Sequence, residues 1–141
     1  MANEHLIDDC IFCKIIRGEI PSHKIAETDK AYSFLDINPI SEGHALVIPK
    51  YHGEFFHQVP DDYLADILPL ARKVALAIGL DEGQYNLLQN NGPMAHQVVP
   101  HVHFHIIPKP NKEEGLIVGW PMKEANQDNL KQLLGKIKEK L

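Results

Sequence analysis

Three histidines alternate with apolar residues in the stretch PHVHFHIIP, residues 100–108. Successive side chains of a β-strand point to opposite faces of a sheet. We therefore predict a strand that carries the imidazoles of His101, His103 and His105 on one face and packs the intervening apolar residues into a core. Burying an imidazole costs free energy unless it finds a hydrogen bond or a metal. Three in alternation therefore indicate a chemical site rather than packing alone.

Two kinds of chemistry suit this pattern. Alternate histidines on one strand can chelate a zinc ion and leave a position open for water. Alternatively, the middle imidazole attacks phosphorus while neutral, with its other N–H held by a carbonyl. The polar turn over residues 90–97 can place amide donors beside the strand, as a phosphate or oxyanion site requires. Because this turn offers no carboxylate to act as a general base for a catalytic zinc, it favours the nucleophile.

Composition narrows the class of protein. A chain of 141 residues can bury a sizeable core, and we expect one domain. The net charge of −5 gives no reason to expect a nucleic acid or an anionic membrane as partner. No apolar run reaches the roughly 18–20 residues that a membrane span needs, and residues 1–5 do not begin a signal peptide. The close spacing of Cys10 and Cys13 suits a metal site or redox pair, which favours a reducing intracellular compartment.

The rest of the chain predicts the elements that position the histidines, and their order predicts an α+β sheet with helices mainly on one face. Residues 1–9 are polar and expected to be flexible. Pro69 lies inside the longest predicted helix and should kink it. The expected elements are a helix over 10–18, strands over 23–27, 31–36, 44–50 and 84–89, the histidine strand, a helix capped by Asp61 or Asp62 that runs to about residue 78–80, and a last helix from Asn126.

The histidine stretch and several other segments resemble the histidine triad (HIT) family. HVHFHII, residues 101–107, matches the family signature HxHxHxx, in which x is apolar. Asn90 and Gln97 stand at a spacing similar to that of the family's site. The resemblance covers most of residues 10–108, and GLIVGWP, residues 115–121, is similar to the tail of fungal-type members of the nucleotide-binding Hint branch. Similar N-terminal segments are Ile11–Ile25, Phe34–Pro39 and Gly43–His52.

This resemblance implies a HIT-like fold over residues 10–121, followed by a helical extension over 122–141. The fold is an antiparallel five-stranded sheet with helices packed on it, which dimerises into a larger sheet. The implied pairing of the homodimer uses the strand over 84–89 and the long helix. An open sheet edge that needs cover is consistent with this.

The resemblance also implies a purine nucleoside monophosphate, AMP or GMP, as the ligand. The implied reaction is hydrolysis of the P–N bond of adenosine 5'-phosphoramidates through a nucleotidyl-histidine intermediate, with no cofactor required for the chemistry. Two alternatives stay open: a dinucleoside polyphosphate hydrolase or nucleotidyl transferase with the same intermediate, and a non-catalytic nucleotide-binding adaptor. We expect a cytoplasmic location, extending to the nucleus in a eukaryotic cell.

The resemblance assigns roles residue by residue. It makes His103 the nucleophile, His101 and His105 its triad partners, and His44 the remote histidine of the site. The implied nucleotide contacts are Asp36 and Ile37 with ribose, Ile11, Phe12, Ile15, Phe34 and Leu46 with the base, and Asn90, Gln97 and His105 with the phosphate.

The sequence departs from the Hint pattern at two positions. His96 stands where that branch commonly has glycine, and Val98 stands where it has a serine that can bind the leaving group or the phosphate. Both changes keep the backbone N–H groups, but the serine hydroxyl is lost. We expect catalytic efficiency and choice of leaving group to depend on them.

Cys10 and Cys13 are shared with family members that carry structural zinc. The remaining ligands of those members correspond to His52 and His101. Four nitrogen and sulfur ligands would close a tetrahedral site. Because cysteine pairs of this spacing also occur without metal, both states remain open at this stage.

Overall fold

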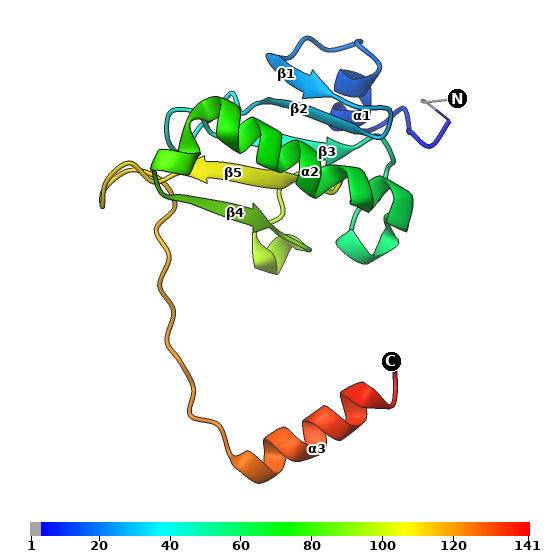
Figure 1. Ribbon diagram of the computed structural model, residues 1–141. Coiled ribbons are helices and arrows are strands. Elements are labelled where there is room, and N and C mark those ends of the chain that lie inside the picture. Colours follow the sequence, from blue (N-terminus) through cyan, green and yellow to red (C-terminus); the bar gives the residue numbers. More distant parts are fainter. Residues whose placement is uncertain (1–3) are drawn as a thin grey trace.

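The computed structural model describes residues 4–141 (Figure 1). Five antiparallel strands form one sheet in the order β1-β2-β3-β5-β4, which confirms the expected fold. The strands are β1 (Lys24–Glu27), β2 (Ala31–Leu35), β3 (Ala45–Pro49), β4 (Tyr85–Gln89) and β5 (Phe104–Pro108). The helices are α1 (Ile11–Ile16), α2 (Asp61–Ile78) and α3 (Gln127–Lys138), with 3₁₀ turns η1 (Phe56–Gln58), η2 (Leu80–Glu82) and η3 (Pro93–Ala95).

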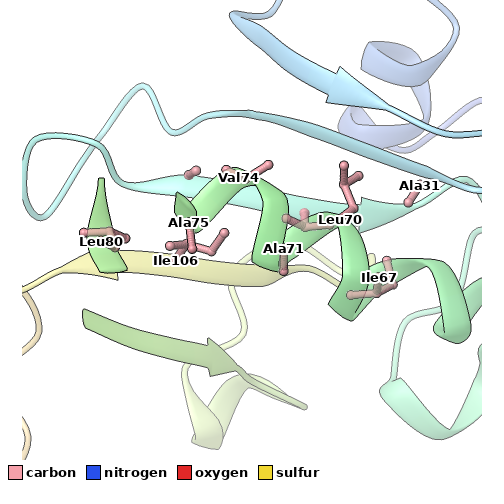
Figure 2. Packing of buried hydrophobic residues seen from close by; sticks show 10 residues of the cluster. Ala31, Ile67, Leu70, Ala71, Val74, Ala75, Leu80 and Ile106 are labelled. Carbon is pink, nitrogen blue, oxygen red and sulfur yellow. The ribbon is translucent and has the colours of Figure 1, made fainter. Parts of the chain in front are cut away.

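Helix α2 covers one face of the sheet (Figures 1 and 2). Its apolar residues Ile67, Leu70 and Val74 pack over alternate strand residues such as Ala31 and Ile106. Truncation of one buried aliphatic side chain in such a core typically costs about 2–5 kcal/mol. This layer therefore holds β5, and with it the histidines, firmly in place.

Helix α1 packs on the opposite face of the sheet, so the expectation of helices mainly on one face is wrong. Strands β2 and β3 are buried on both faces of the sheet along nearly their whole length. In β3, Val47 points toward α2 while Leu46 and Ile48 belong to the cluster around α1. A sheet that is apolar on both faces needs cover on both.

Strand β5 begins at Phe104, four residues after Pro100, where the histidine stretch begins. The prediction that one strand carries all three histidines is therefore wrong for His101 and His103, which precede it. The pairing of β3 with β5 ends at Val47 opposite Phe104, and the backbone N–H of Val102 donates instead to the carbonyl of Gly53 at 2.8 Å. The alternation of faces survives, because Phe104 and Ile106 pack with α2 while His101 and His103 contact Phe12 of α1.

The ends of α2 differ in part from expectation. Pro60 stands at the N-cap without a side-chain hydrogen bond, so the prediction that Asp61 or Asp62 caps the helix is wrong. Both carboxylates lie in the first turn, where they interact favourably with the helix dipole. The helix continues through Pro69 and ends at Ile78, and the φ of 92° of its C-cap, Gly79, lies in the left-handed region.

The two ends of the chain behave differently. Residues 4–9, predicted to be flexible, are tied to the body: the His5 carbonyl accepts from His52 N–H at 2.8 Å, and the Ile7 carbonyl accepts from Arg17 at 3.1 Å. The first three residues, which share that prediction, lie outside the described range. The expected last helix is confirmed as α3, with Asn126 as its N-cap. Among residues 4–141, no helix combines the length and apolarity needed to span a membrane.

Candidate functional site

A row of side chains across four strands forms the floor of a pocket on the α1 face. The register of the sheet places Phe34 of β2 beside Leu46 of β3, Leu46 beside His105 of β5, and His105 beside Leu88 of β4. Because adjacent residues in register share a face, the row is apolar at the β2 end and carries an imidazole at the β5 end. The sheet itself therefore places an apolar surface next to a histidine.

The pocket has a volume of about 550 Å³, within the range of small-ligand sites. Every residue predicted to contact nucleotide lines it except Gln97, and His101 is absent from its walls. Its apolar end is made by Ile11, Phe12, Ile15, Phe34 and Leu46, and its polar end by Asp36, His44, Asn90, His96, His103 and His105, with Ile37 and Val98 on its exposed rim.

His103 presents a free imidazole nitrogen in this pocket. Its Nδ1 lies 2.7 Å from the carbonyl oxygen of His101, and since a carbonyl only accepts, Nδ1 carries the proton. The lone pair of the neutral ring is then on Nε2. Only 6% of the residue is exposed, and burial lowers the pKa of His103 below its ordinary value of 6.5. His103 is therefore a neutral ring near pH 7 with an oriented lone pair, the form that a nucleophilic imidazole requires.

His105 has the opposite tautomer, which a chain of hydrogen bonds sets. The backbone N–H of Ile40 donates to Nδ1 of His44 at 3.1 Å, so His44 carries its proton on Nε2. That nitrogen lies 2.9 Å from Nδ1 of His105, which must accept. Burial lowers the pKa of His44 and lowers that of His105 to about 4. Neutral His105 therefore keeps an Nε2–H, a donor for the oxygens or the leaving group of a bound phosphoryl ester.

Asp36 is the carboxylate nearest to these imidazoles. Its Oδ2 lies 3.5 Å from Nε2 of His44, and its Oδ1 accepts from the backbone N–H of Asn38 at 2.8 Å. Its negative charge favours the protonated form of His44 and His105, but burial is the larger effect on both pKa values. Asp36 therefore stabilises the loop after β2 through its hydrogen bond to Asn38. Its charge does not outweigh burial, so His44 and His105 stay neutral near pH 7.

In the turn before β5, the Gln97 side chain was expected to contact the phosphate. It instead forms hydrogen bonds with backbone groups of the protein. Its Oε1 accepts from Gly92 N–H at 2.7 Å, and its Nε2 donates to the carbonyl of Glu54 at 2.7 Å. Gln97 thus shapes the turn instead of facing the pocket. The neighbouring His96 has a φ of 69°, a left-handed conformation that glycine adopts without strain. This conformation explains why glycine suits that position.

Sequence reasoning missed residues that act through the backbone or through long-range register. The N–H of Ile40 sets the tautomers of two histidines, and the carbonyl of Gly53 ends the strand pairing. Neither group leaves a side-chain signal in the sequence. Leu88 could have been found from alternation in β4, since it lies opposite His105.

A second cluster lies between α1 and the start of β5. The ligand atoms of Cys10, Cys13, His52 and His101 all lie within 4.8 Å of one another. The Sγ–Nδ1 distances are 3.4 Å for Cys10 with His101, 3.6 Å for Cys13 with His101 and 3.6 Å for Cys13 with His52. Tetrahedral zinc with typical bond lengths places its ligand atoms about 3.3–3.8 Å apart. The four predicted ligands therefore fit a zinc ion.

His101 belongs to this cluster and not to the pocket. Its Nε2 lies 3.0 Å from the carbonyl of Pro49 and must donate, which leaves the Nδ1 lone pair aimed at the two thiols. The residue is fully buried, and burial lowers its pKa to about 4. Burial also raises the pKa of the Cys13 thiol to about 12, so without a cation that thiol stays protonated. Of His101, only the backbone carbonyl reaches the chemistry of His103.

Comparison with known proteins agrees with this arrangement. The chain matches the HIT domain family over residues 17–112. It is 57% identical to adenosine 5'-monophosphoramidase HNT1 of Candida albicans over 138 residues, which cover 94% of this chain and 91% of that protein. It is also 57% identical to the enzyme of the same name from Saccharomyces cerevisiae over 132 residues, covering 91% of this chain and 82% of that one.

A solved structure shows the same fold. The crystal structure of a histidine triad nucleotide-binding protein from Candida albicans superposes with a TM-score of 0.91 at 56% identity, covering 94% of this chain and 96% of that chain. A family match over most of the chain, relatives of this identity and a shared fold lead to one assignment. The protein belongs to the HIT family.

Proposed function

We propose that this protein hydrolyses the P–N bond of adenosine 5'-phosphoramidates through a nucleotidyl intermediate on His103. The observation that carries the proposal is the hydrogen bonding that sets opposite tautomers in one pocket: a free lone pair on His103 and an N–H donor on His105. The apolar end of the pocket suits a purine base. The curated names of the Candida and Saccharomyces relatives support the same activity.

The geometry suggests how the reaction proceeds. Nε2 of His103 attacks the α-phosphorus, the P–N bond of the substrate breaks, and the nitrogen takes a proton from solvent and leaves as the amine. The His103 ring is then a cation, and the His101 carbonyl that accepts from its Nδ1 stabilises that charge. Water next attacks the same phosphorus and gives one proton to solvent, the bond between phosphorus and His103 breaks, and AMP is released with His103 neutral again. The Nε2–H of His105 can donate to the phosphoryl group or to the departing amine.

The substrate class is tested by comparing turnover of adenosine phosphoramidate, an AMP–lysine conjugate and diadenosine triphosphate. We expect the two P–N substrates to be hydrolysed faster than the polyphosphate. Faster turnover of diadenosine triphosphate would instead assign a polyphosphate hydrolase. AMP binding without turnover of any of the three would assign a nucleotide-binding adaptor. Replacing adenosine with guanosine in the preferred substrate measures the choice between AMP and GMP.

Turnover should fall as the pH is lowered below neutrality. Because burial lowers the folded-state pKa of His103 and His105, both rings are neutral at pH 7. We expect kcat/KM to be flat through neutral pH and to fall on acidification, with the midpoint below 6.5, the ordinary value for imidazole. A pH–rate profile measured over the range in which the fold is intact checks this. An activity that rises as pH falls through 6 would contradict a neutral nucleophile.

We propose that Cys10, Cys13, His52 and His101 hold a structural zinc ion. The support is the match between the observed Sγ–Nδ1 distances and the edges of a zinc tetrahedron. Zinc would cross-link α1 to the segment before β5. Free thiols and a zinc site both suit a reducing environment, so we also propose an intracellular, cytoplasmic location.

We propose further that two copies pair through α2 and the free edge of β4. Strand β4 ends the sheet, and an open edge is a surface that native proteins cover or pair. A groove of about 430 Å³ lies between α2 and β4 and is lined mainly by apolar side chains. Leu68 and Leu76 of α2, with Tyr85 and Leu87 of β4, are each 46–55% exposed along it. Such a continuous apolar face is typical of a homodimer interface.

Leu76→Asp should shift the protein from dimer to monomer. A carboxylate placed in the apolar groove would have to be desolvated twice in a two-fold interface, which we expect to weaken association at least about 100-fold. Sedimentation equilibrium at micromolar concentration measures this. Ala77→Asp is the matched control, since Ala77 is exposed on the same helix but does not line the groove. A wild-type chain that is monomeric at micromolar concentration would defeat the dimer.

A further inference from the structure

Among residues 4–141, five ionisable side chains line the pocket, and one of them is exposed. His44 and His103 are buried, Asp36 and His105 are half-buried, and His96 is exposed at the mouth. Burial lowers the pKa of the three other imidazoles, which leaves them neutral near pH 7. No lysine or arginine of the described chain lines the pocket. His96 is therefore the side chain of the pocket that can present a cation to a ligand at the mouth.

The backbone of His96 is held in place while its ring is free. Its N–H donates to the carbonyl of Pro93 at 3.0 Å, and its carbonyl accepts from Nδ2 of Asn90 at 3.3 Å. Within the described part of the chain, no group forms a hydrogen bond or an ion pair with the ring. A neutral imidazole offers one donor and one acceptor, and a protonated one offers two donors. Both ring nitrogens of His96 are therefore open to a ligand.

His96 also holds a backbone conformation that glycine would adopt with less strain. Over residues 4–141, it is the one non-glycine residue with a positive φ, at 69°. Residues in this region of conformational space cluster at functional sites, where the surrounding structure enforces the strain. A side chain at such a position indicates that the imidazole has a use in the pocket.

The proposed reaction sends the leaving group toward His96. In-line displacement at phosphorus places the leaving nitrogen opposite the attacking Nε2 of His103. Because His103 is only 6% exposed, its Nε2 attacks from the floor of the pocket and the amine departs toward the mouth. Val98, which follows in the same turn, is 77% exposed at the mouth but has no polar group in its side chain. His96 is therefore the polar side chain that this turn offers to the amine.

The ring of His96 also lies within electrostatic range of the phosphoryl end of the pocket. Burial is the main cause of the low pKa of His105, and the neighbouring imidazoles, His96 among them, lower it further. A group bound beside His105 is therefore within reach of the charge on His96. An anion on the departing amine complements that charge, whereas the pocket offers no other cation to balance it.

We propose that His96 sets the leaving-group specificity by binding a carboxylate on the departing amine. The inference rests on the proposed hydrolysis and names its substrate class: adenosine 5'-phosphoramidates of amino acids linked through the α-amine. Amino acids are the amines in which a carboxylate lies one carbon from the nitrogen, so it lies just beyond the leaving atom. The carboxylate accepts a hydrogen bond from the neutral ring and a stronger, charge-assisted one from the protonated ring.

The test compares two substrates of nearly equal size, the adenosine 5'-phosphoramidates of glycine and of glycinamide. The amine carries a carboxylate in the first and a neutral amide in the second. We expect His96→Gly to lower kcat/KM at least about tenfold for the glycine substrate and less than about twofold for the glycinamide substrate. Because the carboxylate is bound both before and during P–N cleavage, the loss should appear in KM and not in kcat. Glycine adopts the φ of 69° without strain, so the turn is kept.

Met94→Ala is the matched control, since Met94 is fully exposed in the same turn and does not line the pocket. It should leave kcat/KM for both substrates unchanged. An equal fall for both substrates in His96→Gly would assign His96 to the shape of the turn and overturn the proposal. No change for either would also overturn it, because the ring would then not contact the amine. Both results leave P–N hydrolysis intact. A wild-type chain that binds AMP and cleaves neither substrate would remove the hydrolysis as well, which separates the two failures.

Discussion

His103→Ala should abolish turnover of adenosine phosphoramidate while AMP continues to bind. The substitution removes a ring nitrogen of the pocket whose lone pair is oriented by the hydrogen bond of Nδ1 to a backbone carbonyl. Loss of a covalent nucleophile typically costs several orders of magnitude in rate. Binding should persist, because the apolar end of the pocket and the N–H of His105 are unchanged.

The measurement is single-turnover hydrolysis together with AMP titration by calorimetry. His23→Ala is the matched control, since His23 is exposed and does not line the pocket. The control should keep wild-type turnover. A His103→Ala enzyme that retains more than a few per cent of wild-type activity would rule out the nucleophilic role.

Cys13→Ser should lower the melting temperature by at least about 10 °C, as should removal of zinc by a chelator. Binding free energy at a structural zinc site is folding free energy, and a change of 1 kcal/mol shifts the melting temperature of a domain of this size by about 2–4 °C. Zinc content by elemental analysis and a thermal scan are measured on one sample before and after chelation. Turnover should fall only as the fold loosens.

Chelation of the Cys13→Ser variant is the control for this prediction. With the site already broken, the chelator should change its melting temperature no further. A different outcome would point to a catalytic metal: immediate loss of wild-type turnover at an unchanged melting temperature, reversed by added zinc. That result would remove the nucleophilic mechanism along with the structural zinc.

The proposed zinc site and the proposed nucleophile are linked through one residue, His101. The His101 side chain is fixed by Pro49 and the two thiols, and its backbone carbonyl orients the ring of His103. Disorder at the cluster would therefore reach the pocket as a change in His103 orientation. In the proposed mechanism, the cluster therefore acts through the position of His103 and does not contact phosphorus.

Much of the pocket follows from the sequence because strand alternation decides which side chains share a face. The alternation of His101, His103 and His105 correctly predicts their common side, and the resemblance correctly brings Phe12, Phe34 and Leu46 to one cavity. These features depend only on local periodicity and on the family pattern. They survive even though strand β5 starts later than predicted.

The features that escaped prediction depend on groups distant in sequence. The His101 side chain does not line the pocket, because its two ring nitrogens contact the carbonyl of Pro49 and the thiols of Cys10 and Cys13. Gln97 turns inward because Gly92 and Glu54 present backbone groups to it. No spacing rule reveals such backbone partners, because they are set by the packing of loops and not by side-chain type.

The stereochemical course at phosphorus tests the central claim most directly. A covalent nucleotidyl-His103 intermediate requires two in-line displacements, each of which inverts the configuration. An adenosine phosphoramidate made chiral at phosphorus with sulfur, hydrolysed in isotopically labelled water, should therefore give a product with retained configuration. Direct attack by water is a single displacement, and inversion of configuration would contradict the account.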